Sequence, residues 1–109
     1  MKEIKAYVRR FIVEDVIRAL RKAGAHRLAA IDVEGLADEL VGEEKEISSE
    51  LGSTYTPMVK LELICDKKDV ERFVNEIRKV ACTGRKGDGI IAVSSLDDVR
   101  GIRTGKRTC

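Results

Sequence analysis

A glycine-rich stretch, Thr83-Gly84-Arg85-Lys86-Gly87-Asp88-Gly89, holds the residues of this chain best suited to chemistry. Glycine permits left-handed backbone angles and lets a ligand approach the main chain closely. Successive main-chain N–H groups in such a turn converge on an anion, and Arg85 and Lys86 add positive charge beside it. The spacing matches neither a Walker A motif nor a GxGxxG motif. The stretch predicts either an anion-binding loop or a tight connection, and the residues alone leave both open.

Residues that ligate metals or form disulfides are sparse. The three cysteines, Cys65, Cys82 and Cys109, show no CxxC spacing, so neither a disulfide framework nor a zinc knuckle is indicated. His26 is the single histidine, and no second ligand stands at a useful spacing from it. We therefore expect no metal site.

The composition argues against several classes of function. The net charge is +2 and aromatic residues make up 4% of the chain, which disfavours a general nucleic-acid-binding surface. No apolar run approaches the roughly 20 residues of a membrane-spanning helix, and the N-terminus lacks the apolar core of a signal peptide. We expect a single domain over residues 1–109, in the cytoplasm, with no nucleic-acid partner and no membrane span of its own.

Apolar periodicity predicts four strands and two helices. The strands are expected at residues 2–10, 27–34, 57–65 and 90–93, and the helices at 13–23 and 70–81. Gly24 is expected to end the first helix in a left-handed conformation, and Asp66 to cap the second. Residues 99–103 are expected to form an edge strand or an extended segment.

A long acidic loop at residues 36–56 separates the second and third strands. It carries six acidic residues against one lysine. Gly42 and Gly52 bracket a part of it that we expect to form a transient helix. Connections of this length are uncommon in compact domains and are usually functional or mobile, so we expect this loop to contact a partner.

The order strand, helix, strand, loop, strand, helix, strand indicates an α+β fold. It predicts a ferredoxin-like βαββαβ arrangement, an antiparallel sheet with both helices on one face. The other face is expected to carry apolar groups, among them Leu28, Ala30 and Ile64, with Ala29, Ile31 and Val33 together on one face of their strand. One layer of helices cannot cover both faces, which favours self-association.

Two stretches of the sequence resemble the C-terminal signatures of the PII signal-transduction proteins. One is the glycine loop 83–89 followed by a strand, and the other is Ile102-Arg103-Thr104-Gly105 in the basic segment 100–109. The resemblance includes Val33-Glu34-Gly35 before the long loop and Pro57 with Val59-Lys60 after it, and so covers nearly the whole chain.

The resemblance implies a ferredoxin-like homotrimer that performs no catalysis. Members of that family bind ATP or ADP in clefts between subunits, and the ligand changes the conformation of the long loop, the T-loop, which docks onto a transporter, enzyme or regulator. Arg103 is expected to reach the nucleotide across the subunit boundary. The other expected nucleotide-binding residues are Gly35, Leu36, Ala37, Glu62 and Ile64 on the adenine and ribose side, and Gly87, Asp88 and Gly89 at the phosphates.

Several positions depart from the family pattern. Ile90 and Gly101 stand where typical members carry cations for the phosphates, so ADP or AMP is expected as readily as ATP, with the role of Mg²⁺ left open. Glu39 and Met58 replace the residues that serve Mg²⁺ and 2-oxoglutarate, so we expect no sensing of 2-oxoglutarate. At the loop tip, Leu51 replaces the modified tyrosine, and Ile47 replaces the arginine that plugs an ammonium channel.

Three alternatives remain at this stage. The first is a trimeric interaction module that has lost nucleotide binding. A narrower form of the nucleotide-binding hypothesis links the protein to inorganic-carbon transport. The second is an acylphosphatase-like enzyme, disfavoured because Asn75, the single asparagine, falls inside a helix. The third is a metal-binding trimer of the CutA type, disfavoured by the scarcity of ligands.

Overall fold

The computed structural model describes residues 1–36, 40–41, 46–48 and 53–107. Strand β1 (Lys2–Arg9) leads through a 3₁₀ turn (Arg10–Ile12) into helix α1 (Val13–Lys22), and β2 (Leu28–Gly35) follows. A short strand β3 (Glu46–Ser48) precedes the long strand β4 (Ser53–Cys65). A second 3₁₀ turn (Lys67–Asp69), helix α2 (Val70–Ala81) and strand β5 (Ile90–Ser95) complete the order.

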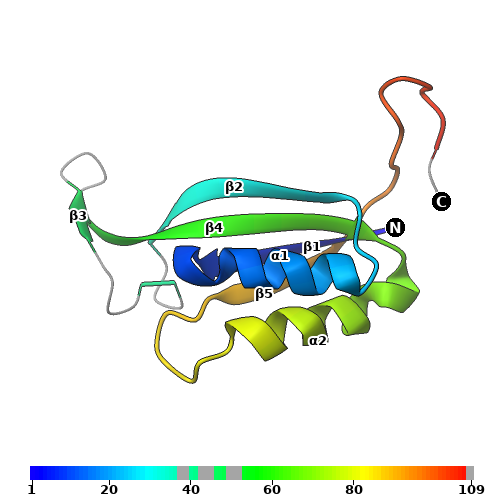
Figure 1. Cartoon of the computed structure of the whole chain (residues 1–109). Coiled ribbons are helices and arrows are strands. Elements are labelled where there is room, and N and C mark those ends of the chain that lie inside the picture. Colours follow the sequence, from blue (N-terminus) through cyan, green and yellow to red (C-terminus); the bar gives the residue numbers. More distant parts are fainter. Residues whose placement is uncertain (37–39, 42–45, 49–52, 108–109) are drawn as a thin grey trace.

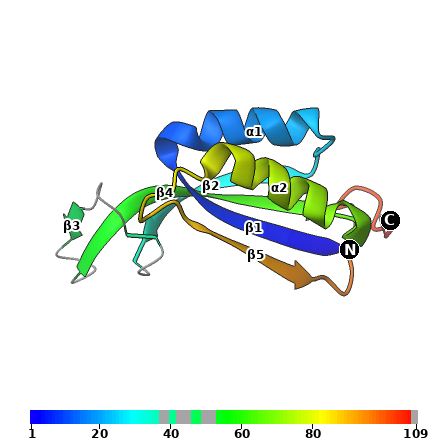
Figure 2. The same ribbon diagram turned by 90° about the horizontal axis from the view of Figure 1, so that it is seen from below.

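The sheet is antiparallel with the strand order β2-β4-β1-β5, and β3 pairs with the far end of β4. Both helices lie on one face of this sheet (Figures 1 and 2). The predicted ferredoxin-like βαββαβ arrangement is therefore confirmed.

The core lies between this face and the helices, as the apolar periodicity predicts. Ile4, Ala6 and Val8 of β1 are at most 2% exposed, so the alternation of this strand has its expected consequence. The stripes of the two helices pack onto them, with Leu20 of α1 and Phe73 of α2 buried. The second helix covers the predicted range.

Gly24 ends α1 as expected, with φ of +103°. The N–H of Gly24 donates to the carbonyl of Arg21 and that of Ala25 donates to Leu20, which is the Schellman pattern. The expected cap of α2 is wrong, because Asp66 makes no side-chain cap hydrogen bond. Its carbonyl accepts from the N–H of Asp69 instead, and a 3₁₀ turn separates it from the helix.

Strand β4 begins at Ser53, four residues before the predicted start. Its first part pairs with β3, where Glu46 lies opposite Tyr55. The expected helix between Gly42 and Gly52 is therefore wrong for residues 46–48, and the rest of that range lies outside the described residues. The stretch 53–56 contains Thr54, Tyr55 and Thr56, which favour strands, while the three residues of β3 are too few to show a strand period.

The register of β2 corrects the faces expected for its residues. Leu28 pairs with Leu63 and Ala30 pairs with Leu61, so both lie on the face that the helices cover. Ile31 and its neighbours at 29 and 33 lie on the other face, which we call the open face, as does Ile64. The side of β2 with Leu28 and Ala30 continues with the acidic Asp32 and Glu34, so the pattern of the strand alone does not fix its orientation. Ile31 is 40% exposed there.

Candidate functional site

The connection from α2 to β5 contains the glycine loop, residues 83–89, which bends through three left-handed glycines. Gly84, Gly87 and Gly89 have φ of +81°, +92° and +118°. A Cβ atom at Gly89 would overlap the main-chain carbonyl of Tyr7. At this position glycine is therefore required both by the backbone angle and by the close approach of β1.

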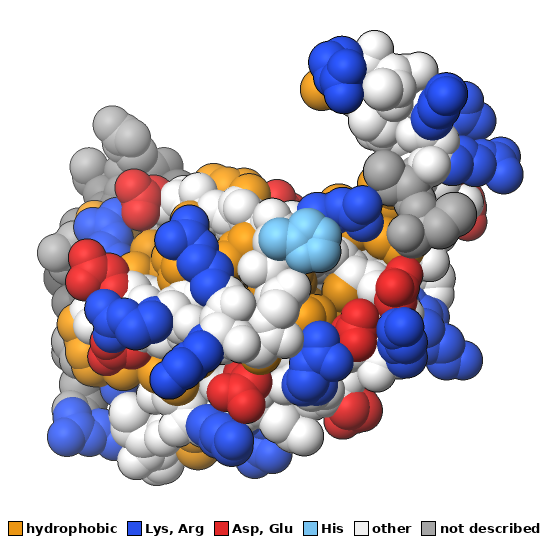
Figure 3. All heavy atoms as spheres, turned by 45° about the vertical axis from the view of Figure 1, so that its right-hand side comes forward, with side chains coloured by type: hydrophobic (Ala, Val, Ile, Leu, Met, Phe, Trp, Pro, Cys, Tyr) orange, Lys and Arg blue, Asp and Glu red, His pale blue; other side chains and the backbone are white. Residues whose placement is uncertain are grey.

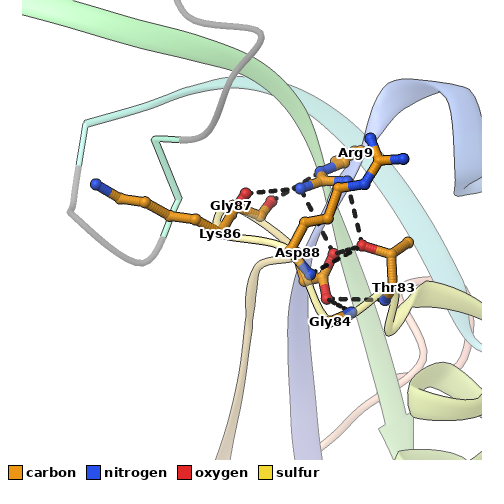
Figure 4. A network of polar contacts seen from close by, with 7 residues as sticks. Arg9, Thr83, Gly84, Lys86, Gly87 and Asp88 are labelled. Carbon is orange, nitrogen blue, oxygen red and sulfur yellow. Dashed lines mark hydrogen bonds and ion pairs between the residues drawn. The ribbon is translucent and has the colours of Figure 1, made fainter.

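Asp88 ties the two ends of this loop together. Its carboxylate accepts hydrogen bonds from the main-chain N–H of Thr83 at 2.8 Å and of Gly84 at 2.9 Å, and from the Thr83 hydroxyl. Burial alone would raise the pKa of Asp88, but these hydrogen bonds, with the Arg9 cation nearby, hold that pKa below its ordinary value. The carboxylate is thus engaged by the loop itself (Figure 4).

Arg9 is the residue of this site that the sequence analysis missed. It stands at the end of β1, 4% exposed, and its guanidinium lies against the glycine loop (Figure 4). Nη2 donates to the carbonyl of Lys86 at 2.7 Å and Nε to that of Gly87 at 3.1 Å. Nη2 also lies 3.5 Å from a carboxylate oxygen of Asp88. The alternation of β1 predicts a solvent-facing side chain here, because it says nothing of the distant loop that covers it.

Asp88 also yields a pH-dependent prediction. Replacing it by asparagine is expected to lower the free energy of unfolding at pH 7 by about 1–3 kcal/mol, because hydrogen bonds to a charged acceptor are lost. Since the folded-state pKa is lowered, the advantage of the wild type is present above the unfolded pKa and disappears as the pH falls through the folded one. Urea unfolding between pH 7 and 2 measures this. The control Asp97→Asn changes an exposed carboxylate, and a difference at pH 7 equal for both variants would contradict the prediction.

The base of the acidic loop lies beside the glycine loop. A Cβ at Gly35 would come 2.8 Å from Cβ of Leu40 and 3.0 Å from Sδ of Met58, and one at Gly89 would lie 3.6 Å from Cε of Met58. Met58 is fully buried and Leu40 is 7% exposed. Met58 therefore joins the two loops in one packed cluster. Leu36 is 47% exposed at its edge, and Ala37 lies outside the described residues.

Glu62 and Ile64 lie at the other end of the sheet. They line a hollow of about 350 Å³, which is completed by Glu3, Arg27, Leu28, Ala29, Val99, Arg100 and Gly101. Gly35 pairs with Thr56, and six further residues of β4 place Glu62 about 20 Å away at a rise of about 3.3 Å per residue. One chain therefore brings Gly35 close to Gly89 through Met58, but it does not bring Glu62 and Ile64 to them.

The C-terminal segment leaves the body of the protein near this second end (Figures 1 and 3). Its chain reverses within residues 100–107, closed by a bridge between Arg100 and Arg107 and by a hydrogen bond from the N–H of Gly105 to the carbonyl of Gly101. The expected edge strand at 99–103 is thus replaced by a turn. The left-handed Gly105 accounts for it.

This turn presents an apolar and a cationic side chain to solvent. Ile102 is fully exposed, and Arg103 is exposed as well. Arg100 and Arg107 pair with Asp98 at 2.6 and 3.2 Å, whereas Arg103 makes no ion pair within the described residues. Lys and Arg side chains gather on the C-terminal segment 100–107, which we call the arm (Figure 3). Because the C-terminal segment leaves the sheet at the end opposite the glycine loop (Figure 1), Arg103 lies far from Gly87–Gly89 of its own chain.

The described residues contain no group of three or more His, Cys, Asp or Glu side chains suited to hold a metal ion. None of the helices described is long and apolar enough to span a membrane.

Comparison with known proteins gives matches over nearly the whole chain. The family model described as "Nitrogen regulatory protein P-II" matches residues 1–106. The chain is 35% identical over 106 residues to the nitrogen regulatory protein P-II of Mesorhizobium japonicum, covering 97% of this chain and 95% of that protein. It is 38% identical over 106 residues to nitrogen regulatory protein P-II 1 of Methanothermobacter thermautotrophicus, covering 97% and 92%. To the P-II protein of Synechocystis it is 32% identical over 107 residues, covering 98% and 96%.

Proposed function

The chain belongs to the P-II family of nitrogen regulatory proteins, and from this premise we propose that it is a cytoplasmic, non-catalytic regulator. It binds ADP, ATP or AMP in clefts between the subunits of a homotrimer. The bound nucleotide changes the acidic loop at 36–56, and this loop docks onto a target protein, a transporter or a metabolic enzyme.

One observation carries the proposal: Met58 packs between the glycine loop and the base of the acidic loop. An anion bound by the main chain of Gly87–Gly89 would lie next to this fully buried side chain. Because packed side chains transmit small displacements, a shift of Gly89 would be felt at Leu40. Binding and signalling would then share one cluster.

The trimer is supported by the distribution of the expected ligand residues. Gly35 and Gly87–Gly89 lie at one end of the open face, whereas Glu62 and Ile64 line a hollow at the other. These residues can serve one nucleotide when the two ends come from two subunits. The exposed Ile31 on the open face and the exposed Ile102 on the arm are apolar surface that such contacts would cover.

The acidic loop suggests the character of the target. Its six acidic residues favour a basic partner surface, and Ile47 and Leu51 in the same stretch favour an apolar slot within that surface. Met58 replaces the lysine expected to hold 2-oxoglutarate, and a thioether offers no charge to a dianion. The proposal therefore excludes 2-oxoglutarate as the second ligand.

A trimeric interaction module without nucleotide binding is the second candidate. Ile90 and Gly101 favour it, since both stand where the family resemblance leads one to expect phosphate-binding cations. In that case the acidic loop would dock in a single state.

Isothermal titration calorimetry of the purified protein with ATP, ADP and AMP tests the proposal, with the trimer verified by light scattering. Each nucleotide is added with and without Mg²⁺, 2-oxoglutarate and bicarbonate. We expect micromolar binding of at least one nucleotide and no added heat from 2-oxoglutarate. An intact trimer that binds none of the nucleotides would establish the interaction module instead. Binding of 2-oxoglutarate with Mg-ATP would contradict the exclusion.

A further inference from the structure

We propose that Arg9 is a positioning residue of the anion site. Its buried guanidinium sets the orientation of two peptide units of the glycine loop, so that the N–H groups of Gly87 and Asp88 face an incoming phosphate. This inference rests on the proposed function and assigns to β1 a part in the site that the loop motif does not contain.

Two hydrogen bonds of Arg9 fall on the main chain of the loop. Its side chain is 5% exposed, and the carbonyls of Lys86 and Gly87 both accept from it, at 2.7 and 3.1 Å. A third contact joins Nη1 to the hydroxyl of Thr83 at 3.5 Å. The guanidinium thus holds the turn of the loop and reaches its first residue (Figure 4).

The orientation of the N–H groups follows from the planarity of the peptide bond. In a trans peptide the carbonyl of one residue and the N–H of the next point in opposite directions, and every peptide bond of the described residues is trans. Because the carbonyls of Lys86 and Gly87 point toward Arg9, the N–H groups of Gly87 and Asp88 point away from it. Gly87 itself is buried, whereas Asp88 and Gly89 are half-buried and line a hollow beside Tyr7 and Ile90. This hollow is the place expected for the phosphate.

Two successive carbonyls can converge on one cation because Gly87 is left-handed, with φ of +92°. The same alternation of backbone angles aligns successive N–H groups on the opposite side, as in an anion-binding nest. Arginine suits this task because its planar fork presents several donors at fixed angles. A lysine ammonium is a point charge on a flexible stem and does not fix two peptide planes in the same way.

Arg9 also balances a negative charge beside the proposed phosphate site. One carboxylate oxygen of Asp88 lies 3.5 Å from Nη2. Without the guanidinium, this carboxylate would repel a phosphate bound at the neighbouring N–H groups. Loss of Arg9 is therefore expected to weaken anion binding in two ways, by freeing the peptide units and by exposing the site to an unbalanced charge.

Variants at adjacent positions separate this role from a general effect of charge. Arg9→Met removes the buried cation, and Arg10→Met removes a neighbouring one whose side chain is 56% exposed and pairs with Asp32 at 3.9 Å. Arg9→Lys keeps the charge and removes the fork. The probes are inorganic pyrophosphate and ADP, titrated into the ¹⁵N-labelled full chain and followed by NMR.

In the wild type we expect pyrophosphate and ADP to shift the amide signals of residues 87–89. Arg9→Met is expected to lower the affinity for pyrophosphate by at least about tenfold, the equivalent of one to two hydrogen bonds to a charged group. Arg10→Met is expected to change this affinity by less than about twofold, because exposed charges are screened. Arg9→Lys is expected to melt near the wild type and yet lose most of the affinity, which a purely structural role would not produce.

Equal pyrophosphate affinity of Arg9→Met and Arg10→Met would overturn the inference, as would a wild type whose loop amides do not respond to pyrophosphate. If Arg9→Met fails to fold, the comparison of Arg9→Lys with Arg10→Met decides in the same way. Failure of the proposed function is seen separately, as wild-type calorimetry without nucleotide binding. If ADP binds by calorimetry and leaves the amides of residues 87–89 unmoved, the proposed function stands and the role of Arg9 falls.

Discussion

Replacing Gly89 by alanine is expected to lower the free energy of unfolding by more than about 3 kcal/mol and to abolish binding of phosphate-containing ligands. Two costs add in this variant. A non-glycine residue at φ of +118° is strained, at about 1–3 kcal/mol, and the new Cβ would overlap the carbonyl of Tyr7. Because that carbonyl belongs to a central strand, the loop rather than β1 is expected to move.

Gly84→Ala is the matched control for this variant. Gly84 is also left-handed, with φ of +81°, but a Cβ there would meet no described atom within 4 Å. Only the backbone strain remains, at about 1–2 kcal/mol, so the glycine loop is expected to keep its place on β1.

Thermal and urea unfolding at matched protein concentration measure both variants. For a domain of this size, 1 kcal/mol corresponds to about 4–8 °C in Tm, so the two variants should differ by several degrees at least. Equal losses in both would mean that the approach of Gly89 to Tyr7 carries no cost, and that backbone angle alone selects glycine in this loop.

The elements with clean periodicity were predictable from the sequence. The alternation of β1 and the stripe of α2 each have one apolar face, and burial follows directly. Strand β2 has apolar residues on both faces, with Asp32 and Glu34 on the side of Leu28 and Ala30. Its orientation therefore depends on its pairing with β4, which the local pattern does not contain. The pairing of β3 was not predicted either, because three residues, Glu46-Ile47-Ser48, are too few to show a strand period.

The glycine loop of the candidate site was predictable from the sequence, but the contact of Arg9 with this loop was not. The glycines at 84, 87 and 89 signal the loop, because each adopts the left-handed angle that glycine permits. Arg9 is far from them in sequence and meets them through the pairing of β1 with β5, where Tyr7 lies opposite Ile90. An arginine at the end of β1 indicates a contact with the glycine loop only once the strand order is known, because that order places the end of β1 beside the loop.

The second large expected effect concerns Ile90, the residue after the glycine loop. Ile90→Lys is expected to tighten ATP binding by about tenfold or more, because one well-made charge-assisted contact contributes about 1.5–3 kcal/mol and each decade of affinity requires about 1.4 kcal/mol. Ile90 pairs with Tyr7 on the open face and is 37% exposed. A lysine there can keep its ammonium group at the surface while its stem covers the sheet.

Calorimetry with ATP and AMP measures this effect, and Val93→Lys is its control. Val93 lies on the same strand, is 47% exposed and pairs with the buried Ile4, so it belongs to the opposite face of the sheet. The control adds the same charge on the other face of the sheet, three residues further along β5, and we expect it to change either affinity by less than about twofold, since an exposed charge at about one Debye length is screened.

The comparison of the two nucleotides decides what Ile90 does in this protein. A gain that is larger for ATP than for AMP means that the new ammonium meets the outer phosphates, and that Ile90 tunes the site toward nucleotides with fewer phosphates. An equal gain in affinity for ATP and AMP that Val93→Lys also shows would mean that the added net charge alone accounts for the effect. No gain in a variant that folds and binds ATP would place the phosphates away from residues 87–90, whereas no ATP binding by either the wild type or the variant would favour the interaction module.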